Sequence, residues 1–277
     1  MVRSDLDGAE PSERYAWAAV ARNVAPFLLL IALAPLVHPW SWLLAPVIGL
    51  FIYRITIVMH DCVHRSLFTS ARLNERVGRT LGALTGIDFH SFTRQHLLHH
   101  RNYGEPGDPQ GFHYLGIGNM STARFGWHLL RPLIGWNLRY TIGESVLAPR
   151  NFLRSFQTGE VLLLGLVQLM LLAIVTGGGR YPWLALLPAV SGATFGLFFS
   201  QLRGIAEHGT RERTREAAFV RSHAPHWFDR LFLYDLNFNC HREHHLNAAA
   251  PSCRLAPGGP DLGSSMLATL RMLRGQA

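Results

Sequence analysis

Four stretches of the chain carry apolar residues almost without a charge. They are Val24 to Leu36, Trp42 to Val58, Val161 to Thr176 and Trp183 to Phe199. A helix needs about 20 apolar residues to cross a bilayer, and each stretch reaches or approaches that length once flanking interfacial residues are included. The pattern therefore predicts four transmembrane helices. A buried core helix is the alternative for the shortest stretch, Val24 to Leu36.

Turn residues divide the four stretches into two hairpins. His38-Pro39-Trp40 separates the first pair and Gly177-Gly178-Gly179-Arg180 the second, and clusters of proline and glycine are typical of turns. The expected fold is an all-α integral membrane protein with a helical cytoplasmic cap. Its expected organisation is one domain over residues 1–277, divided into a polar N-terminal segment (1–20), a first hairpin (24–58), a cytoplasmic segment (59–158), a second hairpin (159–203) and a second cytoplasmic segment (204–277). The acidic, polar start does not fit a cleavable signal peptide.

Composition and charge support this picture and orient it. The chain is 48% hydrophobic and 16% charged, and that charged share is below the usual value for soluble domains. All 26 cationic side chains are arginine, and they gather between Arg65 and Arg154 and between Arg211 and Arg274. Because positively charged loops stay on the cytoplasmic side, we expect both hairpin tips outside and both termini inside, as in a bacterial inner membrane. The net charge of +8 follows from this orientation, and no aromatic-basic module indicates nucleic-acid binding.

Eight histidines gather in three windows, His60 to His64, His96 to His100 and His241 to His245. Residues three and four apart lie on one side of a helix, so each window directs its imidazoles one way. Some clusters would arise by chance among 15 histidines, but three windows in phase indicate a site for more than one metal ion. Asp61 and Arg242 stand where a zinc-protease motif requires glutamate, so that motif is absent.

The long segment between the second and third spans carries its own amphipathic signals. From Ser66 to His100, apolar residues alternate with arginines in a way typical of helices resting at the membrane interface. Glu105 to Pro109 then breaks the helix. A second interfacial face is expected around Trp127 and Trp136, whose indoles suit the headgroup region.

The three cysteines show neither metal-ligand spacing nor a disulfide framework. Cys62 and Cys240 lie inside or beside histidine windows. We expect both to be small packing residues.

In this order, with one hairpin between the second and third, the windows resemble the histidine boxes of the membrane fatty acid desaturase superfamily. His99-His100-Arg101-Asn102 followed by Gly107-Asp108-Pro109 is similar to the sequence after that family's second box, and Asn239 to Leu246 is similar to its third. Arg203 to His208 resembles a stretch that supplies another ligand in relatives. The resemblance covers Val24 to Leu255.

The resemblance implies two non-haem iron ions at the cytoplasmic end of a four-helix stem. The implied metal ligands are nine histidines: His60, His64, His96, His99, His100, His208, His241, His244 and His245. Asn239 would approach the irons. Imidazole suits iron, zinc and copper alike, so only the family likeness selects iron.

Three carboxylates beside these histidines, Asp61, Glu207 and Glu243, are candidate outer-shell residues. A ligating imidazole normally donates its other ring N–H to a carboxylate or carbonyl. An ordinary solvated carboxylate or a structural ion pair is an equal alternative for each. The remaining candidates lack family-like spacing and are expected to be structural: His90, His113, His128, His223 and His226.

The implied reaction uses O2 as co-substrate and removes hydrogen from an unactivated methylene of a lipid or other hydrophobic substrate. Loss of a second hydrogen gives an alkene and insertion of oxygen gives an alcohol, and we favour desaturation over hydroxylation or ketolation. No dinucleotide fingerprint, iron-sulfur cysteine set or haem domain is recognisable, so electrons are expected from a separate ferredoxin-like carrier. An acidic carrier would suit the arginine-rich face.

Other hypotheses about substrate and function stay open. Relatives often place proline within two or three residues of the third box, whereas this chain continues Leu246 to Pro251, so a carotenoid or small amphipathic metabolite is an alternative substrate. A membrane zinc hydrolase would use metal-activated water against an amide or ester. A metal transporter is disfavoured, because its histidines would be expected along the spans.

Overall fold

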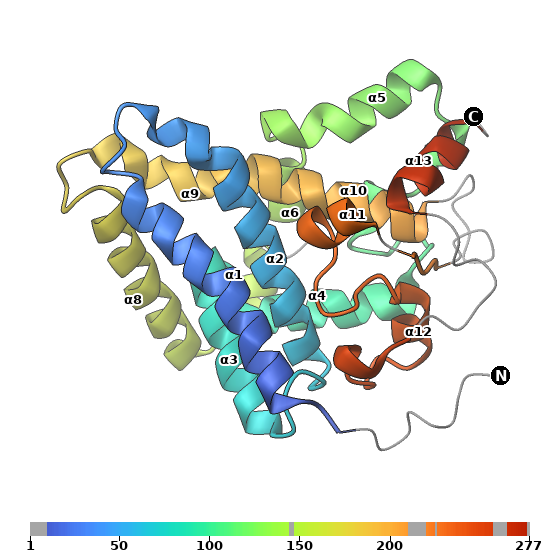
Figure 1. Ribbon diagram of the computed structural model, residues 1–277, viewed down its shortest axis with the longest axis horizontal. Helices are drawn as coiled ribbons and strands as arrows, with labels where there is room; N and C mark the ends of the chain where they lie inside the picture. Colours follow the sequence, from blue (N-terminus) through green and yellow to red (C-terminus); the bar gives the residue numbers. More distant parts are fainter. Residues whose placement is uncertain (1–9, 144–146, 210–219, 225, 257–264, 276–277) are drawn as a thin grey trace.

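The structure, a computed structural model, describes residues 10–143, 147–209, 220–224, 226–256 and 265–275 (Figure 1). All regular secondary structure in these ranges is helical. Among the described residues, four helices are long and apolar enough to cross a membrane: Glu13–Leu33, Trp40–Val63, Thr158–Val175 and Pro182–His208. The predicted all-α class with four spanning helices is confirmed.

The first hairpin consists of α1 (Glu13–Leu33) and α2 (Ala45–Val63), the latter preceded by a 3-10 turn at Trp40–Leu44. Helix α1 begins at Glu13, inside the segment 1–20 that was predicted as polar, and so starts before the predicted apolar stretch at Val24. The side chain of Ser12 accepts a hydrogen bond from the backbone N–H of Tyr15, which caps the helix. Glu13 in the first turn also suits the positive end of the helix dipole.

The second hairpin consists of α8 (Thr158–Val175), α9 (Leu186–Ser191) and α10 (Leu197–His208). Gly177, Gly178 and Gly179 between them all have positive φ, a conformation that glycine adopts without a steric penalty. A π-helical turn at Gly192–Gly196 joins α9 to α10, and the continuous helix extends beyond the predicted end at Phe199.

Gly49 allows α2 to cross this second hairpin closely. A Cβ atom at Gly49 would lie 2.5 Å from Cβ of Phe195 and 2.6 Å from the carbonyl oxygen of Ser191. The two long helices that end near the histidines are therefore in close backbone contact.

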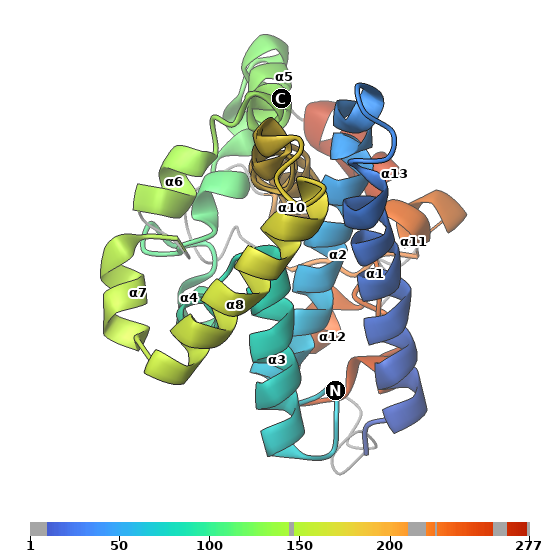
Figure 2. The same cartoon turned by 90° about the vertical axis from the view of Figure 1, so that its left-hand side faces the viewer.

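The segment predicted to rest at the interface forms α3 (Ala71–Thr85) and α4 (Phe89–Asn102). Helix α3 does not rest apart from the membrane helices. It packs beside α2 and α8 (Figure 2). Val77, Leu81 and Leu84 bury its apolar face in the main core. This packing holds the start of α4 against the bundle.

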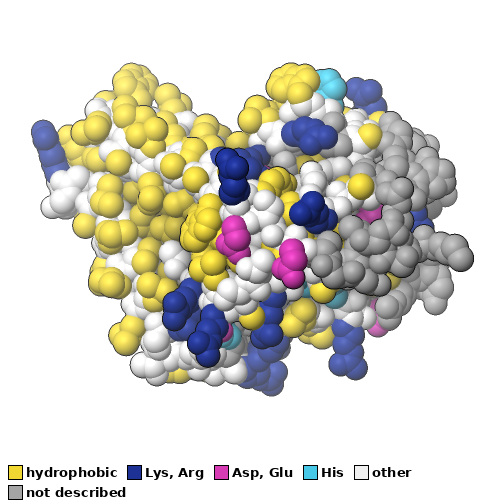
Figure 3. Space-filling model, turned by 60° about the horizontal axis from the view of Figure 1, so that its bottom comes forward, with side chains coloured by type: hydrophobic (Ala, Val, Ile, Leu, Met, Phe, Trp, Pro, Cys, Tyr) yellow, Lys and Arg dark blue, Asp and Glu magenta, His cyan; other side chains and the backbone are white. Residues whose placement is uncertain are grey.

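The other α-helices of the described residues are shorter. They are α5 (Thr122–Leu130), α6 (Leu138–Gly143), α7 (Pro149–Ser155), α11 (Trp227–Phe232), α12 (His241–Leu246) and α13 (Met266–Gly275). Trp127 and Trp136 are exposed, and their position at a membrane interface stays a prediction. Apolar side chains dominate one half of the face in Figure 3, and most arginines lie outside that half.

Candidate metal centre

Nine histidines converge into two groups, and within each group the candidate ligand atoms all lie within 4.8 Å of one another. The first group consists of His60, His64, His96, His100 and His244. The second consists of His99, His208, His241 and His245. These are the same nine histidines that the resemblance implies as ligands.

Helix geometry explains how the three windows are shared between two groups. The histidines at the ends of α2, α4 and α10 come together with those of α12. On α4, His96 and His100 lie four residues apart and enter the first group, while His99 points to the second. On α12 the split is reversed, with His241 and His245 in the second group and His244 in the first. Both helices therefore contribute to both groups.

The spacing of the ring nitrogens fits metal binding. Nε2 of His96 lies 2.9 Å from Nε2 of His64 and 2.9 Å from Nε2 of His100. In the second group, Nε2 of His208 and Nε2 of His241 are 2.9 Å apart. Two nitrogens bonded at right angles to one ion, each at about 2.1 Å, are about 3.0 Å apart. Neutral imidazole has only one N–H, so hydrogen bonds alone do not satisfy several nitrogens that face a common point.

Burial keeps these imidazoles in the neutral form that binds metal. It lowers the pKa of His64 to about 4. Burial, with a smaller contribution from His64, lowers the pKa of His100 to about 3. The pKa of His244 and that of His245 also lie well below the usual value, first through burial and then through neighbouring imidazoles. Near neutral pH, no proton has to be displaced from these rings before a metal ion binds.

Asp61 takes the expected position behind a candidate ligand. Its Oδ1 lies 3.2 Å from Nδ1 of His60, and the hydroxyl of Ser252 donates a hydrogen bond to its Oδ2. Nε2 of His60 is buried and has no hydrogen-bond partner among the described residues. The ring is thus oriented with one nitrogen on a carboxylate and the other available to a metal ion.

Asp108, for which the sequence pattern predicted no role, contacts His99. Nδ1 of His99 lies 2.9 Å and 3.0 Å from the two carboxylate oxygens. The hydroxyl of Tyr114 also donates to Asp108, as does the backbone N–H of Gln110, at 2.8 Å. Burial, and then the carboxylate, raise the pKa of Tyr114, so its phenol stays a donor. In the sequence, the run Gly107-Asp108-Pro109 resembles the family, but nothing in it indicates which histidine Asp108 would contact.

Three other candidate residues, Glu207, Glu243 and Asn239, are not simply paired with the outer nitrogen of a candidate ligand. Oε2 of Glu207 lies 3.4 Å from Nε2 of His241, the nitrogen that faces His208, and 3.2 Å from Nε of Arg203. Glu243 accepts a hydrogen bond from the hydroxyl of Ser222. Asn239 donates to the backbone carbonyl of His223 at 2.9 Å. Functions at the metal for these residues stay predictions.

The remaining residues of the sequence analysis lie outside the two groups. His90 contacts Glu160, and Nε2 of His128 lies 2.7 Å from the carbonyl oxygen of His113. Cys62 and Cys240 are buried and free, as expected of packing residues.

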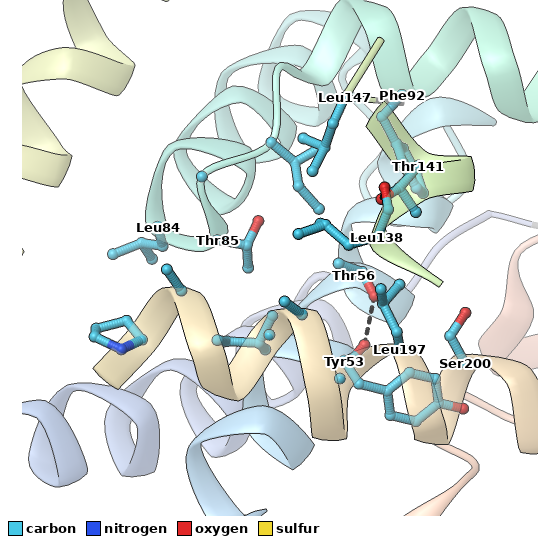
Figure 4. Close-up of a pocket in the computed structure, with 18 of the residues that line it drawn as sticks. Tyr53, Thr56, Leu84, Thr85, Phe92, Leu138, Thr141, Leu147, Leu197 and Ser200 are labelled. Carbon is cyan, nitrogen blue, oxygen red and sulfur yellow. Dashed lines mark hydrogen bonds between the residues drawn. The ribbon is translucent and has the colours of Figure 1, made fainter. Parts of the chain in front are cut away.

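A cavity of about 530 Å³ reaches the first group. His60 and His96 form part of its lining at the metal end, and Leu171, Leu172 and Ala189 line it within the second hairpin. Figure 4 shows apolar and hydroxyl side chains from α2, α6 and α10 around the same space. An extended apolar molecule could therefore lie between the membrane helices with one part close to the first group.

The fold and the site together define a helical membrane protein with paired histidine groups suited to two metal ions. The chain matches the family described as fatty acid desaturase over residues 12–266. It belongs to this family.

Several curated desaturases are similar over a shorter region. A chloroplastic "sn-2 acyl-lipid omega-3 desaturase (ferredoxin)" of Helianthus annuus is 32% identical over 100 residues, which are 35% of this chain and 22% of the relative. An endoplasmic reticulum "Omega-3 fatty acid desaturase" of Nicotiana tabacum is 34% identical over 89 residues, 31% of this chain and 23% of the relative. A "Fatty acid desaturase" of Bacillus subtilis is 31% identical over 96 residues, 33% of this chain and 27% of the relative. Each alignment thus covers less than a third of the relative.

Proposed function

We infer that the protein is an oxygen-dependent di-iron membrane oxidoreductase that desaturates a fatty acyl or lipid chain. The observation that carries this proposal is the apolar cavity of about 530 Å³ whose lining includes His60 and His96. A methylene chain in this cavity would pass close to one group of the histidine centre. Membership of the fatty acid desaturase family supports this proposal.

The nine histidines would hold two iron ions, one in each group. Bound iron would supply the oxidation of a C–H bond by O2, which no amino-acid side chain performs by itself. Asp61 and Asp108 would keep the protons on the outer nitrogens of His60 and His99, so that the inner nitrogens stay available to metal. In this proposal Asn239 approaches the irons, and Glu207 and Glu243 are outer-shell residues beside the ligating histidines.

The rest of the site holds the substrate and excludes water. Leu171, Leu172 and Ala189 would contact the methylene chain. The close crossing of α2 and the second hairpin at Gly49 would close one side of the cavity to the aqueous phase. Because the reacting carbon has no polar handle, its position depends on where the chain is held along this apolar wall.

Electrons would come from a separate carrier. One relative carries ferredoxin in its name. An acidic ferredoxin-like protein would be attracted to the arginine-rich face, which is formed by the segments from Arg65 to Arg154 and from Arg211 to Arg274. That face would be cytoplasmic, with both termini on the same side of a bacterial inner membrane. Docking would then weaken as ionic strength rises.

The test is product analysis in an iron-replete host that supplies an electron donor. Lipids and small metabolites from cells with the wild-type protein are compared by mass spectrometry with those from cells with His244→Ala. Loss of two hydrogens from an acyl chain supports desaturation, whereas gain of one oxygen supports a hydroxylase or ketolase. Zinc in the purified protein, together with activity that persists without oxygen, would contradict the proposal and support a membrane zinc hydrolase instead.

A further inference from the structure

A cluster of charged and amide side chains joins the first hairpin to the loop before α12. It consists of Arg22 and Asn23 of α1, Arg54 of α2 and Asp235 of the loop. Nε of Arg22 donates to Oδ1 of Asp235 at 3.0 Å, and Nη2 of Arg54 donates to Oδ2 at 2.8 Å. The amide of Asn23 donates to the same Oδ2 at 2.6 Å. One carboxylate of the loop thus binds side chains of two apolar helices.

Arg54 uses all three of its guanidinium nitrogens in this region. Besides the bond to Asp235, its Nε donates to Oδ1 of Asn23 at 2.8 Å. Its Nη1 donates to the carbonyl oxygens of Arg230 and Leu231 in the last turn of α11, at 3.2 Å and 2.7 Å. Charged residues inside membrane helices are costly, and they usually mark functional sites. The place of Arg54 in the middle of α2 therefore indicates a function beyond packing of the hairpin.

Asp235 takes part in the cluster as a carboxylate. Burial raises the pKa of the Asp235 carboxyl. Hydrogen bonds from Arg22 and Asn23 and the nearby charge of Arg54 outweigh burial, so that the pKa lies below its usual value. The side chain of Asp235 is only 3% exposed. The loop is therefore fixed to the hairpin by a buried, ionised side chain.

The residues after Asp235 form a turn that leads into α12. Leu236 and Asn237 both have a φ of 56°, in the left-handed region that is unfavourable for leucine. The backbone N–H of Leu236 donates to Oδ1 of Asp235 at 2.8 Å. The N–H of Phe238 donates to the carbonyl oxygen of Asp235 at 2.9 Å. An unfavourable backbone conformation persists only where the surrounding contacts fix it, and Asp235 provides two of these contacts.

The turn places Phe238 against both histidine groups. The centroid of its ring lies 4.5 Å from that of His60, 5.2 Å from that of His241 and 5.8 Å from that of His244. His60 and His244 belong to the first group, and His241 belongs to the second. A shift of this turn would therefore disturb imidazoles of both groups.

Helix α12 depends on such contacts for its position. It has six residues, and a helix shorter than about 12 residues is marginal by itself. Its start is bonded to the turn, because the N–H of Cys240 donates to the carbonyl oxygen of Asn237 at 2.9 Å. The three histidines of α12 are thus placed in part by the segment that leads into it.

We propose that Asp235 is a positioning residue of the metal centre. Bound by Arg22 and Arg54, it fixes the turn that sets Phe238 and α12 against the histidines of α2 and α4. Asp235 acts on the centre through this turn. The inference rests on the part of the proposed function that places a metal ion in each histidine group, and it does not depend on which reaction follows.

The experiment measures metal binding without turnover. Metal-free protein in neutral detergent is titrated with Co²⁺, which stands next to Fe²⁺ in the affinity order of divalent metals and whose visible absorption changes with its ligands. The key variant is Asp235→Asn, which removes the charge, and Asp235→Glu keeps it. The matched control is Asp229→Asn. Asp229 is also buried, but it caps α11 by accepting a hydrogen bond from the N–H of His226 at 3.1 Å.

Wild-type protein should bind two Co²⁺ ions per chain, one in each group. Asp235→Asn should weaken the binding of at least one ion by about tenfold, the lower end of the range for residues that orient metal ligands, and should alter the visible spectrum. Asp235→Glu should recover most of the affinity, and Asp229→Asn should resemble wild-type protein in affinity and spectrum. Thermal melting of the metal-free proteins checks that each variant folds.

A second variant keeps the test decisive if Asp235→Asn does not fold. Arg22→Gln removes one donor from a side chain that is 39% exposed, and it leaves Arg54 and Asn23 on the carboxylate. It should change cobalt binding in the same direction as Asp235→Asn, by a smaller factor.

Two outcomes would overturn the inference. One is unchanged affinity and spectrum in every folded variant of Asp235 and Arg22. The other is an equal loss of cobalt binding in Asp229→Asn, since the effect would then reflect general destabilisation. Failure of the desaturase proposal would look different, because wild-type protein would bind two Co²⁺ ions normally while product analysis showed no unsaturated chain.

Discussion

The two histidine groups are made of the same side chain, yet their surroundings differ. The first group reaches the apolar cavity through His60 and His96. The second group includes His99, bound by the buried carboxylate of Asp108, and His241, close to Glu207. Both groups thus have a buried carboxylate behind one of their histidines, through Asp61 and Asp108, and they differ in that the histidines in the described lining of the apolar cavity come from the first group.

This contrast shows how neighbouring positions on one helix acquire different tasks. His99 and His100 are adjacent on α4, but a turn of about 100° per residue sends them into different groups. The environment of each group then depends on what the rest of the chain places beside it. Variants that perturb one group at a time test how far this separation extends.

The largest effect is expected from removing one ligand of each group. His244→Ala and His245→Ala affect adjacent positions on α12, one in the first group and one in the second. Each should abolish detectable turnover and lower the iron content of the purified protein, because each removes a nitrogen that no nearby side chain replaces. His38→Ala, at the tip of the first hairpin, serves as the control for a histidine far from the centre. Full activity in both variants would contradict the ligand assignment.

The next effect tests the carboxylates behind the two groups. Asp108→Asn should weaken iron binding or activity by about 10- to 100-fold, the usual range for the partner of a ligating histidine. Asp61→Asn should act through His60 in the first group. Competition with a chelator, followed by the fraction of iron released, separates loss of affinity from loss of catalysis. Unchanged iron retention and turnover in both variants would show that neither carboxylate orients a ligand.

A moderate effect is expected from shortening the cavity. Ala189→Phe places a bulky ring in the apolar wall but leaves both histidine groups intact. Turnover of long acyl chains should fall by about tenfold relative to shorter ones, with iron content unchanged. The ratio of products from a mixture of chain lengths measures this. An unaltered ratio would remove the cavity from the proposed substrate path.

The smallest effect is a dependence of stability on pH in the metal-free protein. Burial lowers the pKa of His64 to about 4 and that of His100 to about 3, so the unfolded chain takes up protons first as pH falls. Stability should therefore be complete above about pH 6.5, the usual histidine pKa, and should decrease as pH falls toward 4. Thermal melting after chelator treatment follows this. The iron-loaded protein should resist acid to a lower pH, since metal competes with protons.

The sequence pattern was sufficient for the spans and for the three histidine windows, and the family resemblance added His208 to the histidines that the structure brings together. Long apolar stretches and imidazoles at helical spacing are local patterns, and they survive folding unchanged. The early start of α1 at Glu13 was missed, because a polar first turn capped by Ser12 does not look like part of a span.

The partition into two groups and the pairing of Asp108 with His99 depend on tertiary packing. His99 and Asp108 are separated by the turn after α4, whose path no periodic pattern reveals. The charges of Arg54 and Asp235 likewise look unrelated in the sequence. Only the packing of the loop before α12 against α2 shows that they pair.

The distance in sequence between ligands of one group has a consequence for biosynthesis. Nε2 of His244 lies 3.2 Å from Nε2 of His100, although 144 positions separate the two residues in the sequence. A nascent chain still lacking α12 would have an incomplete first group and only two members of the second. Iron loading should therefore follow synthesis and insertion of the chain through α12, and a ribosome-bound fragment that stops before His241 should not retain metal ions in both groups.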